Sequence, residues 1–352
     1  MRHRHRLALT AAAAAISLTA AGAIGTTALA GTRPSGHHHR LPAQVYAPYY
    51  ETYLAPNTAS ISAVARRSGA RYFTLAFLQT AKKGSCALDW NGTSSQPLAY
   101  YAGDIARLRK IGGDVIPSFG GGYADGNGMD IADSCTDVNK IAADYEQVIT
   151  TYNVTRLDFD VEDYSESNLP GIDRRNKAIA LVEQWAAAHH RTVQFVYTLG
   201  TNMTGLDVPQ GEDVLENAVQ NHARIDIVNI MTFDYYDGLP HEMGKDTVTA
   251  ATAVIGQLHT IYPQKSTEQL WQMLGITEMI GIDDYGPPEV LTPADAAYVE
   301  NWAARTGIAE LSFWALERDN GGCVGTAGSD TCSGVAQSTW EFSHILEPFN
   351  RW

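Results

Sequence analysis

Short apolar segments alternate with longer amphipathic segments along the chain from Pro42 onward. In the short segments apolar side chains occupy both alternating faces, which is typical of buried strands in a parallel sheet covered by helices. Eight such segments are predicted as strands, at residues 45–50, 72–78, 114–119, 156–162, 192–198, 225–233, 272–276 and 310–316.

The intervening segments carry apolar residues at the three- to four-residue spacing of amphipathic helices. They are predicted as helices at residues 60–67, 100–111, 138–152, 174–190, 212–220, 248–262, 293–306 and 338–346. Eight strand-helix units fit a (β/α)8 TIM barrel, an α/β fold, better than a doubly wound sheet. Because the composition does not change along this stretch, we expect residues 42–352 to form a single catalytic domain.

The N-terminal residues have the pattern of a secretory signal peptide. Arginines within the first six residues precede an Ala-rich apolar run at residues 7–23, and Ala-Leu-Ala at 28–30 is a small-residue cleavage site. The run contains Ser, Thr and Gly and is too weakly hydrophobic to favour a membrane anchor. We therefore expect a signal peptide at 1–30, a disordered linker at 31–41 and a secreted, extracellular protein.

The charge of the chain limits its partners. There are 39 acidic residues against 25 Lys and Arg, which gives a formal net charge of -14. Nucleic acids and anionic membranes bind through clustered Lys and Arg, so neither is an expected partner. A polyanionic substrate is disfavoured for the same reason.

Four cysteines, all after the predicted cleavage site, indicate two disulfides in an exported protein. Of the three connectivities, we favour Cys86 with Cys135 and Cys323 with Cys332, because the second pair brackets a Gly-, Ser- and Thr-rich loop. A zinc site is the alternative, but the cysteines lack Cys-x-x-Cys spacing.

Three acids share one face of the fourth predicted strand. Side chains alternate along a strand, so Asp158, Asp160 and Glu162 point to one side and the apolar residues between them to the other. This pattern suits a solvated edge, a divalent-cation site or a catalytic carboxylate set. In a barrel Glu162 falls at the C-terminal rim, where such enzymes carry their chemistry, and burial of like charges raises carboxyl pKa values toward those of general acids.

Other predicted strand ends carry residues suited to a ligand site. Gly120 and Gly121 follow the third strand, where glycines let the backbone approach a ligand closely. Aromatic residues also gather at strand ends and indicate stacking platforms for sugar rings. These aromatic residues are Tyr49, Tyr50, Trp90 and Tyr123.

These features resemble family 18 glycoside hydrolases, the family of chitinases and endo-β-N-acetylglucosaminidases. The family's strand-four signature, Asp-x-x-Asp-x-Asp-x-Glu, is matched by Asp158, Asp160 and Glu162. Its other signatures are Ser-x-Gly-Gly, Met-x-Tyr-Asp and a strand-eight Trp. They correspond here to Ser118, Gly120 and Gly121, to Met231 and Asp234, and to Trp314.

The chain departs from the family pattern at two positions. Thr155 replaces the first Asp of the strand-four signature, outside the inward-facing row of acids. Phe233 occupies the usual strand-six Tyr position. Tyr235 shares a strand face with Phe233, and we hypothesise that it supplies the missing hydroxyl.

The resemblance implies a substrate-assisted, retaining hydrolysis without metal or cofactor. It implies that Glu162 is the general acid, that Asp160 orients the substrate acetamido group and that Asp158 tunes the pKa of Asp160. It further implies that Met231, Asp234 and Tyr235 shape the acetamido pocket and that Trp314 forms its floor.

The expected substrates are chitin or N-acetylglucosamine oligomers, and the protein is expected to act as a monomer. The stretch at 276–310 leaves room only for a loop and one helix, so the cleft is expected to be shallow and cleavage to be internal. An endo-β-N-acetylglucosaminidase acting on N-glycan cores and a non-catalytic chitin-binding lectin on the same barrel are the alternatives. A cation-binding carboxylate site is less favoured, because no His or further acid cluster completes a coordination sphere.

Overall fold

The structure is a computed structural model and describes residues 41–54 and 59–350. The predicted signal peptide at 1–30 and the predicted linker at 31–40 lie outside the described residues. Leu41, at the end of that predicted linker, is buried in an apolar cluster with residues of the first strand.

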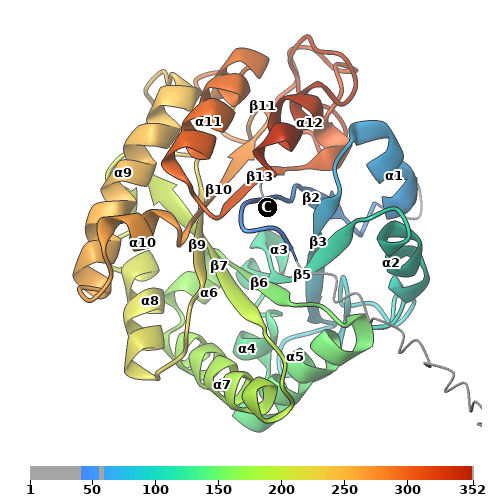
Figure 1. Cartoon of the computed structure of the whole chain (residues 1–352), viewed down its shortest axis with the longest axis vertical. Coiled ribbons are helices and arrows are strands. Elements are labelled where there is room, and N and C mark those ends of the chain that lie inside the picture. The colour runs from blue at the N-terminus through green and yellow to red at the C-terminus, as the bar shows by residue number, and fades with distance from the viewer. Residues whose placement is uncertain (1–40, 55–58, 351–352) are drawn as a thin grey trace, which may run out of the picture. The chain divides into compact units, whose positions relative to one another are not determined.

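Parallel strands form a closed ring that helices surround (Figure 1). The strands follow one another round the ring in chain order, each hydrogen-bonded in parallel to the next. This arrangement confirms the predicted (β/α)8 barrel. The ring strands are β1 (Val45–Tyr46) with β2 (Tyr49–Glu51), β3 (Tyr72–Thr80), β5 (Asp114–Gly120), β6 (Arg156–Val161), β7 (Gln194–Asn202), β9 (Ile227–Met231), β10 (Leu274–Met279) and β13 (Glu310–Trp314).

The first barrel strand is interrupted in the middle. Sequence predicts one strand at 45–50, whereas the structure has β1 and β2 on either side of Ala47 and Pro48. Proline has no N–H to donate to a ladder. The pairing nonetheless continues, because the Ala47 N–H donates to the Leu311 carbonyl and the Pro48 carbonyl accepts from the Thr74 N–H. The two halves therefore join the last strand to the second and close the barrel.

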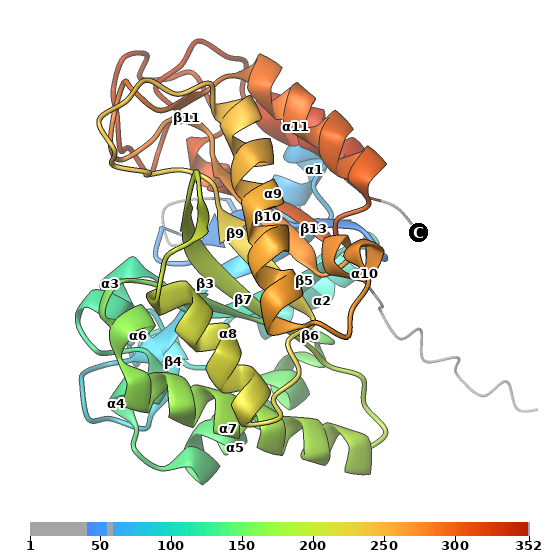
Figure 2. The ribbon, with the colours of Figure 1, turned by 90° about the vertical axis from the view of Figure 1, so that its left-hand side faces the viewer.

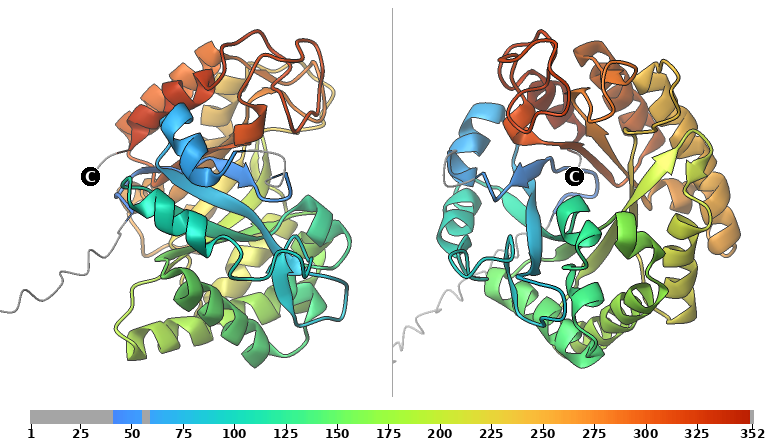
Figure 3. Two further views of the ribbon diagram at one scale, coloured as in Figure 1. Left: turned by 90° about the vertical axis from the view of Figure 1, so that its right-hand side faces the viewer. Right: turned by 180° about the vertical axis from the view of Figure 1, so that it is seen from behind.

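Helices on the outside of the ring cover the apolar strand faces, as the side and rear views show (Figures 2 and 3). Two predicted helices begin five residues earlier than expected, at Leu169 instead of residue 174 and at Met243 instead of residue 248. In the first case Pro170 lies in the opening turn, where its missing N–H costs nothing. The helices are α1 (Ile61–Ser68), α2 (Ala102–Arg109), α3 (Gly122–Gly126), α4 (Ile131–Ser134), α5 (Val138–Tyr152), α6 (Asp163–Ser167), α7 (Leu169–Ala188), α8 (Gln210–Gln220), α9 (Met243–Ile261), α10 (Thr267–Trp271), α11 (Pro293–Thr306) and α12 (Glu341–Leu346), with 3-10 turns η2 (Leu316–Arg318) and η3 (Glu347–Phe349).

Strand β6 shows how the sequence pattern builds the two sides of the barrel wall. Phe159 points outward into the core beneath α5, where its ring lies 5.0 Å from Tyr145 and 5.3 Å from Phe119. The acids that alternate with it lie on the inner side. At the start of the strand, buried Arg156 forms an ion pair of 2.5 Å with Glu310 of β13. The barrel interior is therefore strongly polar along this strand.

Loops after the C-terminal strand ends build one end of the barrel (Figure 2). They include the short strands β4 (Leu88–Trp90), β8 (Gly205–Leu206), β11 (Gly281–Ile282) and β12 (Val290–Leu291). Between β10 and β13 there is only the β11–β12 hairpin and α11, close to the expected loop and helix.

Two disulfides fasten the loops. Cys86 is bonded to Cys135 and Cys323 to Cys332, which confirms the favoured pairing and excludes a zinc site made of these cysteines. Within the described residues no helix is long and apolar enough to cross a membrane.

Candidate active site

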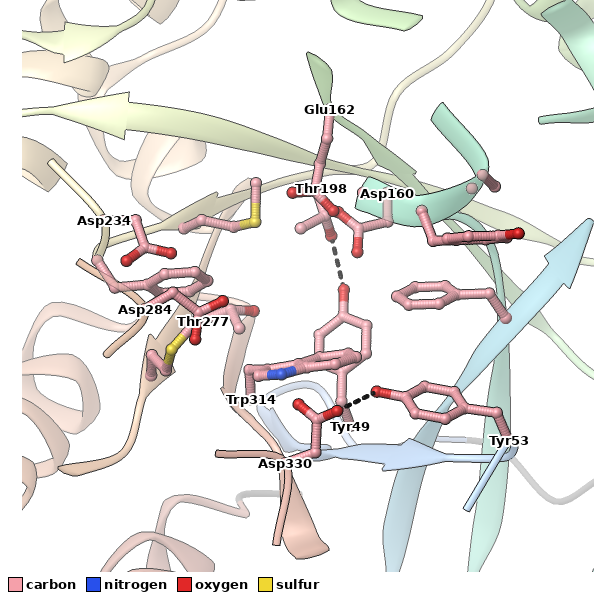
Figure 4. Close-up of a pocket in the computed structure, with 18 of the residues that line it drawn as sticks. Tyr49, Tyr53, Asp160, Glu162, Thr198, Asp234, Thr277, Asp284, Trp314 and Asp330 are labelled. Atoms are coloured by element: carbon pink, nitrogen blue, oxygen red, sulfur yellow. Dashed lines mark hydrogen bonds between the residues drawn. The ribbon is translucent and has the colours of Figure 1, made fainter. Parts of the chain in front are cut away.

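A cavity of about 570 Å³ opens at the C-terminal ends of the barrel strands (Figure 4). Its lining combines aromatic rings with five carboxyl groups. The lining residues are Tyr49, Tyr53, Phe77, Gln79, Asn91, Gly120, Gly122, Tyr123, Ala124, Asp160, Glu162, Thr198, Met231, Phe233, Asp234, Thr277, Met279, Asp284, Trp314 and Asp330.

Asp158 lies beneath this cavity and is fully engaged by hydroxyl donors. Its carboxylate accepts hydrogen bonds from Ser118 at 2.5 Å, Thr198 at 2.8 Å and Tyr49 at 3.0 Å. Burial raises the pKa of Asp158 to about 6, against the lowering effect of these hydrogen bonds. Asp158 is therefore held rigidly and is shielded from any ligand in the cavity.

Asp160, one layer nearer the rim, lies at the cavity wall and is 4% exposed. Its Oδ1 atom is buried without a hydrogen-bond partner. Burial, and then the charges of Glu162 and Asp158, raise the pKa of Asp160 well above its ordinary value. A buried polar atom that lacks a partner costs free energy, so this oxygen is suited to a hydrogen bond with a ligand.

Glu162 follows the last residue of β6 and also lies at the cavity wall. The Glu162 backbone N–H donates to Oδ2 of Asp125 at 2.7 Å. Burial, followed by the negative charge of Asp163, raises the pKa of Glu162 to about 7. A carboxyl group with this pKa is substantially protonated near neutral pH and is suited to general acid catalysis.

Aromatic rings form a platform across the cavity from Glu162 (Figure 4). Trp314, at the end of β13, stacks on Phe77 with 5.7 Å between ring centroids and an interplanar angle of 11°. Tyr49 packs 5.6 Å from Trp314. Such a platform suits the C–H face of a sugar ring.

Three further acids line the cavity, namely Asp234, Asp284 and Asp330. Burial raises the pKa of Asp234 to about 6. Tyr53 donates from its hydroxyl to buried Glu51 and lies 3.4 Å from Oδ2 of Asp330.

Most site residues predicted from sequence meet at this cavity. Three lie behind the lining instead. Asp158 lies beneath the cavity, Ser118 donates to Asp158, and Gly121 packs under the ring of Phe77. Gly121 has a φ of 82°, and a Cβ there would lie 2.5 Å from that ring, so glycine is required. The predicted residues that line the cavity are Tyr49, Gly120, Asp160, Glu162, Met231, Asp234 and Trp314.

The hypothesis for Tyr235 is not supported by the geometry. Its ring is buried 5.0 Å from His241, its hydroxyl has no hydrogen-bond partner, and it is not among the lining residues. Strand β9 ends at Met231, so the alternation that was extended to Tyr235 no longer applies there. Phe233 lines the cavity in its place.

Two of the four strand-end aromatic residues are core residues. Trp90 is buried and donates from its indole N–H to the Tyr152 hydroxyl, and Tyr50 donates from its hydroxyl to the Ala59 carbonyl. Tyr49 and Tyr123 line the cavity as expected, and Tyr123 is 73% exposed.

Several lining residues were missed from sequence. Thr198 and Thr277 are polar residues within apolar strands, and their side chains face the barrel interior as the acids of β6 do. Asn229 donates hydrogen bonds to both of their hydroxyls. The same alternation of polar and apolar residues predicts the inward facing of both threonines. Asp284 and Asp330 lie in loops, where the sequence has no periodicity that predicts which way a side chain points.

The cation-site reading finds no support among the residues that the structure describes, since no group of three or more His, Cys, Asp or Glu is placed to hold a metal ion. The cavity offers an acid with a raised pKa at its rim, an unpartnered carboxyl oxygen beside it and an aromatic platform opposite. This set suits acid-assisted cleavage of a sugar chain.

Comparison with known proteins agrees with this geometry. Residues 44–319 match the family described as "Glycosyl hydrolases family 18". The chain is 31% identical over 324 residues to the "Probable bifunctional chitinase/lysozyme" of Escherichia coli strain K12, and 31% identical over 287 residues to "Endochitinase 11" of Metarhizium anisopliae. These matches cover 88% and 79% of this chain, which spans 35% and 53% of the two relatives.

A solved structure is similar over nearly its whole length. The catalytic domain of a hyperthermophilic chitinase from Pyrococcus furiosus superimposes with a TM-score of 0.77 at 32% identity, over 88% of this chain and 96% of that one. Catalytic-site mutants of active domain 2 of the thermostable chitinase from Pyrococcus furiosus, complexed with chito-oligosaccharides, give a TM-score of 0.76 at 31% identity, over 88% and 95%.

Proposed function

This chain belongs to family 18 of the glycosyl hydrolases, and from that premise we propose that it is a chitinase that hydrolyses β-1,4 bonds between N-acetylglucosamine units. The observation that carries the proposal is the pairing of Glu162, whose pKa burial raises to about 7, with the unpartnered Oδ1 of Asp160 in one cavity. The complex of the Pyrococcus furiosus domain with chito-oligosaccharides supports the choice of substrate.

Glu162 supplies the proton in the first step. Its carboxyl group protonates the glycosidic oxygen as the bond to the leaving sugar breaks. Its protonated fraction falls as pH rises through about 7, so turnover declines on the alkaline side. In the second step the Glu162 carboxylate removes a proton from the attacking water and returns to its starting state.

The substrate's own acetamido oxygen takes the place of a protein nucleophile. It attacks the anomeric carbon and forms an oxazolinium-type intermediate, which water opens with net retention of configuration. Oδ1 of Asp160 accepts the acetamido N–H and so orients the acetamido oxygen toward the anomeric carbon. Asp158, held in place by its hydroxyl donors, raises the pKa of Asp160 through its charge. Trp314 and Phe77 support the reacting sugar.

The short β11–β12 hairpin supports an internal cleavage mode. No larger insertion rises between β10 and β13 to wall the cleft. A chain that enters such an open groove is cut away from its ends. Export from the cell is proposed from the N-terminal signal pattern and from two disulfides, which form in oxidising compartments.

Two hexamers test the mechanism directly. The N-acetylglucosamine hexamer should be cleaved to short oligomers whose new reducing ends are initially in the β configuration by NMR. The fully deacetylated glucosamine hexamer should remain intact, because it has no acetamido oxygen to attack. Cleavage of both at similar rates would contradict substrate assistance, and an intact acetylated hexamer would contradict the chitinase assignment.

A further inference from the structure

A second cavity lies beside the first at the same end of the barrel. Glu162 lines the first cavity, and the next residue, Asp163, lines the second. The second cavity is formed by α6, by the turn between β7 and β8, and by the start of α8. Its lining residues are Asp163, Glu166, Ser167, Asn202, Thr204, Leu206, Asp207, Val208 and Gln210.

Glu166 is the unusual residue of this cavity. It is only 9% exposed, and its Oε1 atom is buried without a hydrogen-bond partner. A Cβ placed on Gly211 would lie 3.2 Å from that oxygen, so the start of α8 already packs closely on the carboxyl group. A buried carboxyl oxygen without a hydrogen-bond partner costs free energy, unless a ligand donates a hydrogen bond to it.

The other charged residues that line the cavity with Glu166 are all acidic. Asp163 and Asp207 lie in the same lining, and no Lys, Arg or His belongs to it in the described part of the chain. The nearby Lys83 ammonium lies 5.2 Å from the ring centroid of Tyr164 and outside the lining. One oxygen of Asp207 accepts from Asn202 at 2.8 Å, while its negative charge has no counter-ion there. Burial and the Asp207 charge raise the pKa of Glu166 to about 8.

We propose that this second cavity binds a positively charged sugar unit, a glucosamine whose free ammonium group donates to Glu166 and Asp207. An ammonium has three N–H donors, which suits three acidic side chains supplemented by the hydroxyl and amide groups of the same lining. A divalent ion is disfavoured, because no group of three acids in the described residues has metal-binding geometry. The sugar identity rests on the proposed function.

The position of the cavity decides which part of the polymer it takes. We place the leaving part of the polymer at this second cavity, because Asp163 directly follows Glu162, the residue that protonates the leaving oxygen. The enzyme therefore favours partly deacetylated chitin with an acetylated unit at the reacting position and free amines in the leaving part. The first cavity is acidic as well, with five carboxyl groups and no Lys, Arg or His among its lining residues.

The test compares wild-type protein with Glu166→Gln and Asp207→Asn. Each is given partly deacetylated chitosan, and the products are sequenced by mass spectrometry for free amines in the units next to the cut on the leaving side. Wild type should enrich glucosamine there about ten- to a hundredfold over a random cut, as expected for one charge-assisted hydrogen bond. Both variants should reduce this enrichment, and 0.5 M salt should reduce it in wild type.

Glu216→Gln is the matched control, since Glu216 is exposed on α8 outside the lining and its loss removes the same charge. It should leave the enrichment unchanged. Equal enrichment in wild type and Glu166→Gln would overturn the proposal, as would an effect of Glu216→Gln equal to that of Glu166→Gln.

A binding measurement separates this inference from the proposed function. Glucosamine tetramer, which the reaction does not cleave, should bind wild type about ten- to a hundredfold more tightly than Glu166→Gln by calorimetry. Binding without any hydrolysis of acetylated hexamer would remove the chitinase assignment and keep the subsite. Hydrolysis of acetylated hexamer without tetramer binding that depends on Glu166 would keep the chitinase assignment and overturn the subsite. Calcium or magnesium should also be titrated alone. If either ion binds wild type and not Glu166→Gln, the cavity is a metal site and the proposal is overturned.

Discussion

Glu162 is positioned through its backbone as well as its side chain. Its N–H donates to Asp125, which belongs to α3 and is completely buried. Oδ1 of Asp125 has no partner, and burial, followed by the charge of Asp130, raises the Asp125 pKa well above its ordinary value. The catalytic geometry therefore depends on a residue that does not line the cavity.

Replacing Asp125 with Ala should lower kcat by about 10- to 100-fold with a smaller change in KM, because Glu162 loses its backbone acceptor and shifts. Asp125→Asn keeps an oxygen acceptor and should recover most of the turnover. Steady-state kinetics on acetylated hexamer measures both. Equal losses in kcat for the Asn and Ala variants, at unchanged thermal stability, would contradict a positioning role.

Regular strands made the carboxylate row predictable. Within β6 alternation holds from Arg156 to Val161, so the inward facing of Asp158 and Asp160 follows from the sequence alone. The rule failed after β9, where Asp234 and Tyr236 adopt φ values of 52° and the chain turns. It also failed for Trp90, which lies on the antiparallel strand β4 instead of a barrel strand. Residues brought in by loops, such as Asp330, have no local signal.

The two disulfides close loops of very different length, with sequence separations of 49 and 9 residues. Chain entropy makes the longer closure more stabilising. Replacing Cys86 and Cys135 with Ser should therefore lower the free energy of unfolding by about 4 kcal/mol, against about 2.5 kcal/mol for Cys323 and Cys332.

Urea denaturation of the two double variants measures this difference. The Cys323 and Cys332 variant should also raise KM, because Asp330 of the same loop lines the cavity. A larger loss of stability on opening the short loop would contradict the entropic account.

At the scale of the whole molecule, buried carboxyl groups couple stability to pH. Burial raises the pKa of Glu310 to about 7 and that of Glu278 to about 8. At a pH between the unfolded and the folded pKa, such a group is protonated in the folded protein and ionised in the unfolded chain. The folded state therefore binds more protons in this pH range. Stability should therefore fall as pH rises from about 4.5 through 8.

Glu278→Gln tests this coupling away from the cavity. Glu278 is fully buried, accepts from the Thr247 hydroxyl at 2.7 Å and has one unpartnered oxygen. The neutral amide does not ionise, so the variant should gain on the order of 3 kcal/mol relative to wild type between pH 5 and pH 8.5. Thermal unfolding at the two pH values measures it, and identical pH profiles for variant and wild type would contradict the account.

The central claim is that Glu162 is the acid of a chitinase. The most direct measurement is mass-spectrometric product analysis of N-acetylglucosamine hexamer with wild type, Glu162→Gln and the exposed control Glu216→Gln. Wild type and the control should cleave it, while Glu162→Gln should bind it and turn over about 100- to 10,000-fold more slowly. Near wild-type turnover by Glu162→Gln would contradict the claim.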